Sequence, residues 1–475
     1  MTKLLSILLV LATGGPACAA TQTHSTAPGQ LRVPLQIGGV VPELLDPRLQ
    51  DPTIDLMKRA NLADVGRITV TWQRGQTAMD PGQLGDLRTG VDKATAAGVD
   101  VYLDVYPNGS SQTPNSPADQ ADFATWVASV VAGLPNLKHV IVGNECNLNL
   151  FCLPQYGSAA QDLAAINYTK LMAKTYDAIK AVAPAVEVVG GALAHSGTDK
   201  RSSARQTHSP AQFILDMGAA YRALKRSKPI MDAFAYHPYM ERADLPPTLR
   251  HVRSKTLTIA DYGKLLSVLK RAFAGTGQKG ANLPLVYDEF GVEAQVPAAQ
   301  LASYSGQEPP TTHTVPESTQ AKYYEQGFHL AACQPTVRVI MVFRLIDSEF
   351  LESFQSGVYY ADRKTPKSSL PAVAAAATKY RSRTITGCAT LLAPTPVISW
   401  PTRTLTCDAD CAYVETFRRV GSSAPVATIR GTALAGVDTR LTQAKLKPGR
   451  YRIALRVTAT AYRANAFTAT SPPFG

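Results

Sequence analysis

The sequence of 475 residues has little of several features that mark particular classes of protein. Charged residues make up only 18% and hydrophobic residues 45%, a balance typical of a folded protein with a large core and not of a disordered chain. No apolar run is long enough to span a bilayer. The formal net charge is +12, but no basic run is interleaved with aromatic residues. We therefore expect neither a membrane span nor a nucleic-acid partner.

The first twenty residues have the pattern of a secretory signal peptide. Lys3 supplies the positive end, Leu4–Leu11 an apolar core and Ala17-Cys18-Ala19 a small-residue cleavage site. This pattern predicts a secreted, extracellular protein. A lipid anchor on Cys18, which would hold the protein at the cell surface, is the alternative, although Gly15-Pro16-Ala17 fits a lipobox poorly.

Cysteine and histidine are also scarce, with seven and eight residues. No histidine stands at ligand spacing from a cysteine pair, which argues against a zinc site. Six cysteines remain after Cys18, and an even number in an exported chain suggests disulfides. Spacing and order predict three local pairs: Cys146–Cys152, Cys333–Cys388 and Cys407–Cys411.

Apolar runs typical of strands alternate with amphipathic helical stretches from residue 31 to 385. Eight strands are expected, at 32–38, 66–72, 99–105, 138–143, 186–191, 230–237, 284–289 and 337–345. One helix is expected after Ser116-Pro117, a cap followed by a first-turn proline. Eight strand–helix repeats favour a closed (β/α)8 TIM barrel over an open sheet. The polar segments 192–210 and 238–256 are expected to be long loops of this barrel.

The pattern of apolar and polar residues changes after the predicted barrel. Residues 386–396 contain two prolines and are expected to form a linker. From 397 to 475 short alternating runs are punctuated by Gly and Pro, without helical periods. This rhythm predicts a small all-β sandwich domain of immunoglobulin or fibronectin type III. It contains no candidate catalytic residue, so we expect an accessory domain.

Two short strings follow predicted strands and each contains a glutamate. Gly143-Asn144-Glu145 follows the fourth strand, and Asp288-Glu289-Phe290-Gly291 ends the seventh. The carboxyl ends of barrel strands form one rim, where active sites lie. Two glutamates so placed can face each other, which is what glycosidic bond cleavage needs. The alternative for each glutamate is a helix cap or a salt-bridge partner.

These strings resemble those of the retaining glycoside hydrolases of clan A, with families 5 and 39 the most similar. The resemblance covers the predicted barrel and implies that Glu145 is the acid/base and Glu289 the nucleophile. It also implies that Asn144 holds the 2-hydroxyl of the sugar.

Two further strings agree with the resemblance. Arg67-Ile68-Thr69-Val70-Thr71-Trp72 matches a strand-two pattern, which implies that Arg67 bonds the nucleophile and that Trp72 contacts substrate. His237-Pro238-Tyr239 implies a Tyr239 that donates to the nucleophile and a His237 that lines the sugar site. The alternatives are a rim salt bridge for Arg67 and a packed turn for His237-Pro238-Tyr239.

The chain departs from the clan pattern at three places. Cys146 stands where a proline often follows the acid/base, and Phe343 and Arg344 occupy the neighbourhood of a tryptophan that often ends strand eight. At the end of strand three, family 5 commonly has a histidine, and this chain offers Asp104, Tyr106 and Asn108 instead. These departures leave the sugar undetermined.

The sequence thus predicts an exported retaining glycoside hydrolase that acts on a carbohydrate without a metal or an organic cofactor. The alternatives are a transglycosylase, which uses the same residues, and a non-catalytic carbohydrate-binding or adhesion protein on a barrel scaffold. The run Gly275–Gly280 matches G-x-G-x-x-G, but it follows a helix and precedes a strand, so it is expected to be a loop and not a dinucleotide site.

Overall fold

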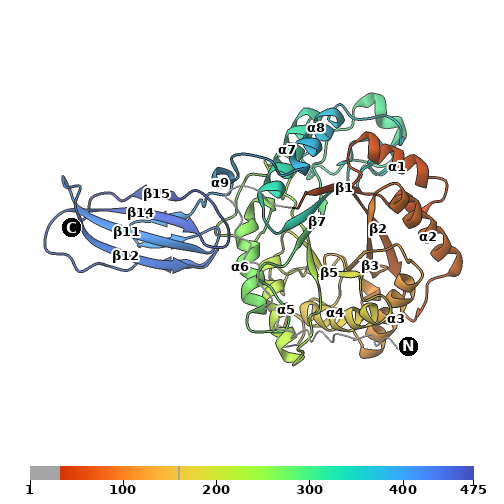
Figure 1. The fold of residues 1–475 in the computed structure, drawn as a ribbon, viewed down its shortest axis with the longest axis horizontal. Helices are drawn as coiled ribbons and strands as arrows, with labels where there is room; N and C mark the ends of the chain where they lie inside the picture. The colour runs from red at the N-terminus through yellow and green to blue at the C-terminus, as the bar shows by residue number, and fades with distance from the viewer. Residues whose placement is uncertain (1–32, 159–160) are drawn as a thin grey trace, which may run out of the picture.

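The computed structural model describes residues 33–158 and 161–475. The predicted signal peptide and the candidate anchor at Cys18 lie outside the described residues. Eight parallel strands close into a barrel in sequence order, with β8 paired to β1, and helices surround it (Figure 1). The predicted (β/α)8 barrel is confirmed.

The barrel strands lie close to the predicted ranges. They are β1 (Gln36–Val40), β2 (Val65–Trp72), β3 (Asp100–Pro107), β4 (His139–Val142), β5 (Glu187–Ala194), β6 (Ala233–His237), β7 (Leu285–Phe290) and β8 (Val337–Val342). The first strand begins four residues later than expected. Pro34 lies in the predicted strand and has no N–H to donate to a ladder, so the paired segment starts after it.

The barrel helices follow from capping and apolar periodicity. They are α1 (Gln50–Arg59), α2 (Pro81–Ala96), α3 (Pro117–Ala132), α4 (Leu163–Val182), α5 (Pro210–Ala223), α6 (Tyr262–Phe273), α7 (Glu317–Cys333) and α8 (Leu370–Arg381). Short 3-10 turns lie at Pro42–Leu45, Ser110–Gln112, Ile259–Asp261 and Ala298–Ser303. At the start of α3 the Ser116 hydroxyl accepts a hydrogen bond from the Asp119 amide at 3.0 Å, as predicted for a cap. The G-x-G-x-x-G run lies between α6 and β7, as expected for a loop.

Seven strands after the barrel form two facing sheets. They are β9 (Val397–Ser399), β10 (Thr404–Thr406), β11 (Cys411–Arg419), β12 (Pro425–Ala433), β13 (Asp438–Arg440), β14 (Tyr451–Ala459) and β15 (Phe467–Thr470). The orders are β13-β10-β9 and β12-β11-β14-β15. Leu405, Tyr413 and Leu455 belong to the apolar core of this sandwich. The sandwich extends away from the barrel on the side of α6, and a short helix, α9 (Cys388–Leu391), lies within the predicted linker (Figure 1).

The three predicted disulfides are formed. Cys146–Cys152 closes the loop that follows β4, Cys333–Cys388 joins the end of α7 to α9, and Cys407–Cys411 closes a five-residue loop of the sandwich. Within the described part of the chain, no helix combines the length and the apolar character that a membrane crossing requires.

The disulfide-closed loop Cys407–Cys411 docks on the barrel. Arg250, in the loop between β6 and α6, donates to Asp408 and to the carbonyls of Leu391 and Ala393. Ser267 of α6 donates to Asp410 at 2.5 Å. These contacts fix the long β6–α6 loop against the sandwich, and residues 240–243 of the same loop also line the pocket that contains Glu145 and Glu289.

Candidate active site

The carboxyl ends of the barrel strands surround a pocket of about 430 Å³, within the usual range of ligand sites. Both predicted catalytic glutamates line it, together with Arg67, Asn144 and Tyr239. The aromatic part of the wall comes from Tyr106, Phe151, Tyr239, Phe343 and Phe354. Aromatic faces of this kind suit the apolar faces of sugar rings, while the carboxylates suit the hydroxyl groups.

Glu145 reaches the pocket through a tight turn after β4. Gly143 has a φ of +88°, and an added Cβ would come within 2.6 Å of the Tyr168 ring, so this position requires glycine. Glu145 itself has a φ of +41°, and its amide donates to the carbonyl of Ala192 on β5 at 2.7 Å. The strained backbone is therefore held by the neighbouring strand, and it fixes the direction of the Glu145 side chain.

Asp288 and Glu289 are consecutive on β7, yet both carboxylates face the same cluster. The pairing of β7 with β8 shifts register between Tyr287 and Phe290, which is a β-bulge or a similar irregularity. A bulge interrupts the strict alternation of sides along a strand. This local feature explains how both acidic side chains reach the centre of the rim.

Arg67 is the buried cation of the cluster. Its guanidinium donates to Glu289, to Asp104 at 2.6 Å and to Asn144 Oδ1 at 2.9 Å, and it lies 3.4 Å from Asp288. Only 2% of its side chain is exposed. The planar guanidinium offers five N–H donors in a fixed fork, against three on the ammonium of a lysine, so it suits a site with several acceptors.

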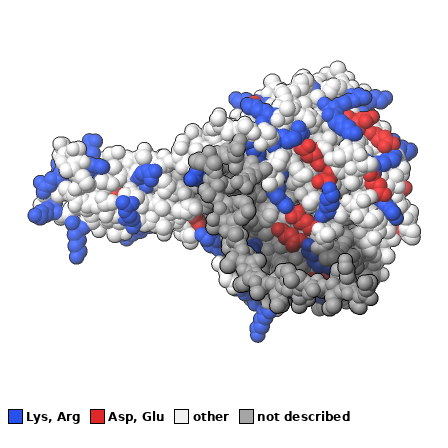
Figure 2. All heavy atoms as spheres, in the orientation of Figure 1, with Lys and Arg blue, Asp and Glu red and all other residues white. Residues whose placement is uncertain are grey.

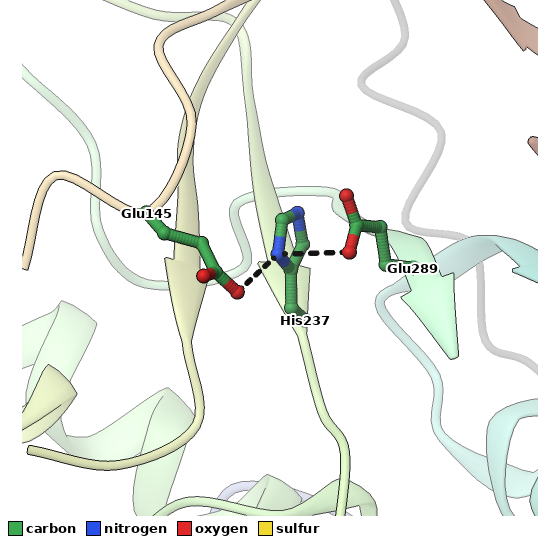
Figure 3. Close-up of side chains that lie close together, drawn as sticks. All are labelled: Glu145, His237 and Glu289. Atoms are coloured by element: carbon green, nitrogen blue, oxygen red, sulfur yellow. Dashed lines mark hydrogen bonds and ion pairs between the residues drawn. The ribbon is translucent and has the colours of Figure 1, made fainter. Parts of the chain in front are cut away.

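His237 lies between the two glutamates, as Figure 3 shows. Its Nδ1 atom is 2.9 Å from Glu145 and 3.5 Å from Glu289, and its Nε2 atom is 3.2 Å from Asp288. The ring is fully buried beneath the pocket. Tyr239, two residues further, donates to the second oxygen of Glu289 at 2.9 Å.

Burial and charge shift the titration of these groups in different directions. Burial lowers the pKa of His237, but the Glu289 and Asp288 carboxylates outweigh it and raise this pKa well above its usual value. Burial raises the pKa of Asp288, but His237 and Arg67 outweigh it, so the pKa of that carboxyl is lowered. The pKa of Glu145 is raised, mainly by burial, although the bond with His237 opposes the shift. The cluster therefore favours a histidinium beside an ionised Asp288 and a protonated Glu145.

The structure brings six of the seven predicted site residues together and leaves one out. Glu145, Glu289, Asn144, Arg67 and Tyr239 line the pocket, and Arg67 and Tyr239 bond Glu289 as the resemblance implied. His237 is buried and contacts both glutamates without lining the pocket, and its predicted place in the sugar lining stays a prediction.

Trp72 does not contact the pocket. Its side chain is fully buried, donates to the Gln76 carbonyl at 2.8 Å and packs edge-on against Phe123 at 5.5 Å between ring centroids. The residue belongs to the core between β2 and α3, and no contact in the structure supports its predicted role in substrate binding. Phe343, at the end of β8, does line the pocket, whereas Arg344 turns to Glu43 at 3.4 Å.

Several pocket residues were not expected from the sequence. Glu293 lines the pocket, and burial raises its pKa to about 7. His195 follows β5, and burial lowers its pKa to about 4, so its ring is neutral at pH 7. Glu241 is held by His251 at 3.1 Å. These residues lie on long loops, and only their position after predicted strands could have drawn attention to them.

Glu145, His237 and Glu289 could also offer a metal ion one ligand atom each, and these atoms lie within 4.8 Å of one another. Each of these side chains already has a hydrogen-bonding partner in the cluster: Arg67 and Tyr239 for Glu289, and His237 for Glu145. The hydrogen bonds account for the close approach of the three side chains, and we assign no metal to them.

No family model and no curated protein matches the chain. Among solved structures, the chain is similar to a family 39 glycoside hydrolase from the gut symbiont Bacteroides cellulosilyticus WH2, with a TM-score of 0.51 and 16% identity over 83% of this chain and 74% of that one. It is also similar to GH5_18 from Streptomyces cattleya, crystallised in complex with GlcNAc, with a TM-score of 0.51 and 17% identity over 74% of this chain and 81% of that one. At these identities the similarity is one of fold, and both neighbours are glycoside hydrolases.

Proposed function

We propose that this chain is an exported retaining glycoside hydrolase that cleaves O-glycosidic bonds of an oligosaccharide, polysaccharide or glycoside by double displacement. The observation that carries the proposal is the pair Glu145 and Glu289, which face each other at the rim with carboxylate oxygens within 4.8 Å. Carboxyl groups about 5 Å apart are typical of retaining enzymes, while inverting enzymes need about 6.5–9.5 Å to admit a water molecule.

Glu289 is the proposed nucleophile. Arg67 and Tyr239 donate to its two oxygens and so hold the carboxylate in one orientation toward the pocket. In the first step a Glu289 oxygen forms a bond to the anomeric carbon while the bond from that carbon to the leaving oxygen breaks. Asn144 shares Arg67 through its Oδ1 atom, which leaves its amide nitrogen to bind a sugar hydroxyl.

Glu145 is the proposed acid/base. Burial raises its pKa, which favours the protonated form that gives a proton to the leaving oxygen as the glycosidic bond breaks. In the second step Glu145 takes a proton from water, the water oxygen bonds to the anomeric carbon, and the ester to Glu289 breaks. His237 contacts both glutamates and holds their side chains in position relative to each other.

A panel of aryl glycosides and polysaccharides tests the proposal, with Glu289→Ala, Glu145→Ala and Glu349→Ala compared. Glu349 is exposed and outside the pocket, so its variant is the control. We expect Glu289→Ala to lose turnover of every substrate. Glu145→Ala should retain turnover of aryl glycosides with activated leaving groups, and azide should raise it further.

Three outcomes would redirect the proposal. Equal loss in both pocket variants on an activated substrate, without azide rescue, would contradict the two roles. Transfer of the glycosyl group to added sugar in preference to water would identify the transglycosylase alternative. Saturable sugar binding without turnover of any substrate would identify the non-catalytic alternative.

A further inference from the structure

More than half of the net positive charge of the chain lies on the sandwich. Residues 397–475 contain eleven Lys and Arg against four Asp and Glu, a net charge of +7 out of the +12 of the whole chain. In Figure 2 the sandwich carries projecting Lys and Arg side chains with almost no acidic side chain in view. The barrel, in contrast, shows both signs intermixed on the same face.

The four carboxylates of the sandwich lie away from the outer face of its larger sheet. Asp408 and Asp410 face the barrel, where they accept from Arg250 and Ser267. Glu415 is fully buried and paired with Arg403. Asp438 belongs to the smaller sheet.

The outer face of the sheet β12-β11-β14-β15 is therefore cationic, and we call it the arginine face. Its arginines are Arg418, Arg430, Arg452 and Arg456, which alternate along the strands with the buried residues of the core. Threonines fill most of the remaining outward positions: Thr416, Thr428, Thr432, Thr458, Thr468 and Thr470. No aromatic or acidic residue stands at an outward position of these strands.

The register brings like charges together. Arg418 lies directly opposite Arg452 on the neighbouring strand, and Val414 of β11 is paired on one side with Arg430 and on the other with Arg456. Like charges at opposed positions destabilise a sheet. Arg430, Arg452 and Arg456 form no ion pair within the described part of the chain, so the repulsion is not relieved internally.

We propose that the arginine face binds an acidic polysaccharide, at a site separate from the pocket of the barrel. Neighbouring strands are about 4.8 Å apart and residues two apart on a strand about 6.6–6.8 Å, so the cations form a flat lattice with spacings of about 5–14 Å. Such a lattice complements a chain with repeated anionic groups, and guanidinium groups bind carboxylate or sulfate in a bidentate way. The threonine hydroxyls between the arginines provide donors and acceptors for sugar hydroxyls.

The composition of the arginine face favours a polysaccharide over two other anionic partners. Single-stranded nucleic acids need aromatic side chains for base stacking, and this face has none. A membrane-binding surface inserts large apolar side chains, and the apolar residues at the outward positions are only Val414, Val426, Ala412 and Ala454, none of them aromatic or long. A glycan partner also agrees with the proposed function. The test does not depend on that function, because it measures binding and not turnover.

The test uses the full chain and two pairs of matched polymers. Polygalacturonate is compared with its methyl ester, which masks the carboxylates, and dextran sulfate is compared with dextran. The face variant carries Arg418→Gln, Arg430→Gln, Arg452→Gln and Arg456→Gln. The control variant removes the same charge from exposed, unpaired barrel positions by Lys170→Gln, Lys228→Gln, Lys279→Gln and Lys322→Gln.

Affinity is measured by gel retardation at low and at near-physiological salt. We expect the parent to bind the anionic polymers and not the neutral ones, with affinity that falls as salt rises. The face variant should bind about tenfold or more weakly because it loses four charge contacts, each of which contributes modestly. The control variant should bind like the parent and keep its thermal midpoint, whereas the face variant should match or exceed that midpoint because Arg418 and Arg452 no longer repel each other.

Several results would overturn the proposal. These are an equal loss in the two variants, an absence of parental binding to both anionic polymers at low salt, and equal binding to the neutral polymers. Tighter binding to duplex DNA or to vesicles with anionic phospholipid than to either polysaccharide, lost in the face variant, would assign the face to that other partner.

Discussion

Replacement of Arg67 by methionine tests how the buried charges of the site are balanced. The guanidinium bonds Glu289, Asp104 and Asn144 and lies beside Asp288, and neither aspartate is exposed to water. Removal of one partner from a buried ion pair costs about 3–5 kcal/mol because the other charge is left uncompensated. We expect Arg67→Met to lower the thermal midpoint by several degrees, and Asp104→Asn added to it to restore part of the loss.

The loss of stability in Arg67→Met should depend on pH, because it follows the ionisation of Asp104. Burial raises the pKa of Asp104 to about 6 even with the Arg67 guanidinium beside it, and loss of that cation raises the pKa further. A folded-state pKa above the unfolded value of about 3.9 means that the group destabilises the fold increasingly as pH rises through this interval. The deficit of Arg67→Met should therefore be smaller at pH 5 than at pH 7.5.

Thermal unfolding by far-UV circular dichroism measures the effect. Arg88→Met is the control, since Arg88 is exposed and its pair with Asp92 at 3.7 Å contributes little. Midpoints that fall additively in the Arg67→Met, Asp104→Asn double variant, or a deficit that is equal at both pH values, would refute the account of Arg67 as the counterion of buried carboxylates.

Three further predictions concern the pocket. With a poor leaving group, turnover should fall as pH rises through the raised pKa of Glu145, and a dinitrophenyl leaving group should remove this alkaline limb from the pH–rate profile. The double variant Cys146→Ala, Cys152→Ala should lower kcat several-fold, because the loop beside Glu145 loses its covalent closure; an unchanged kcat would show that the turn alone suffices. Arg250→Met should raise KM for an oligosaccharide several-fold, because the β6–α6 loop loses its hydrogen bonds to the sandwich and to the linker. The control Arg440→Met, at an exposed position of β13, should leave KM unchanged. Equal KM values in the two variants would support the purely accessory role first expected for the sandwich.

The barrel and the pair of glutamates at its rim could be predicted from the sequence because both depend on local patterns. Strand and helix periods repeat eight times, and the rule that barrel strands present their carboxyl ends at one rim then places Glu145 and Glu289 together without knowledge of any contact. Arg67 and Tyr239 were found through a resemblance in strings, and the structure places both on Glu289.

The remaining parts of the site depend on interactions that no local pattern encodes. In an ideal strand the side chains of Asp288 and Glu289 would point to opposite faces. The register shift in β7 allows both side chains to reach the cluster. Trp72 belongs to a string that resembles the clan pattern, but its ring packs against Phe123 and donates a hydrogen bond to the Gln76 carbonyl. Glu241 takes its position from His251, ten residues away in a loop without periodicity.

The disulfide between Cys333 and Cys388 gives the molecule a second covalent connection between its two parts. The main chain passes from α8 to α9 through residues 382–387, and the disulfide bypasses this segment by joining α7 directly to α9. A protease that cuts the chain between Ser382 and Gly387 would therefore leave both fragments linked. The cut protein would run as one species on a non-reducing gel and as two after reduction, and the sandwich would stay attached to the barrel despite a broken backbone.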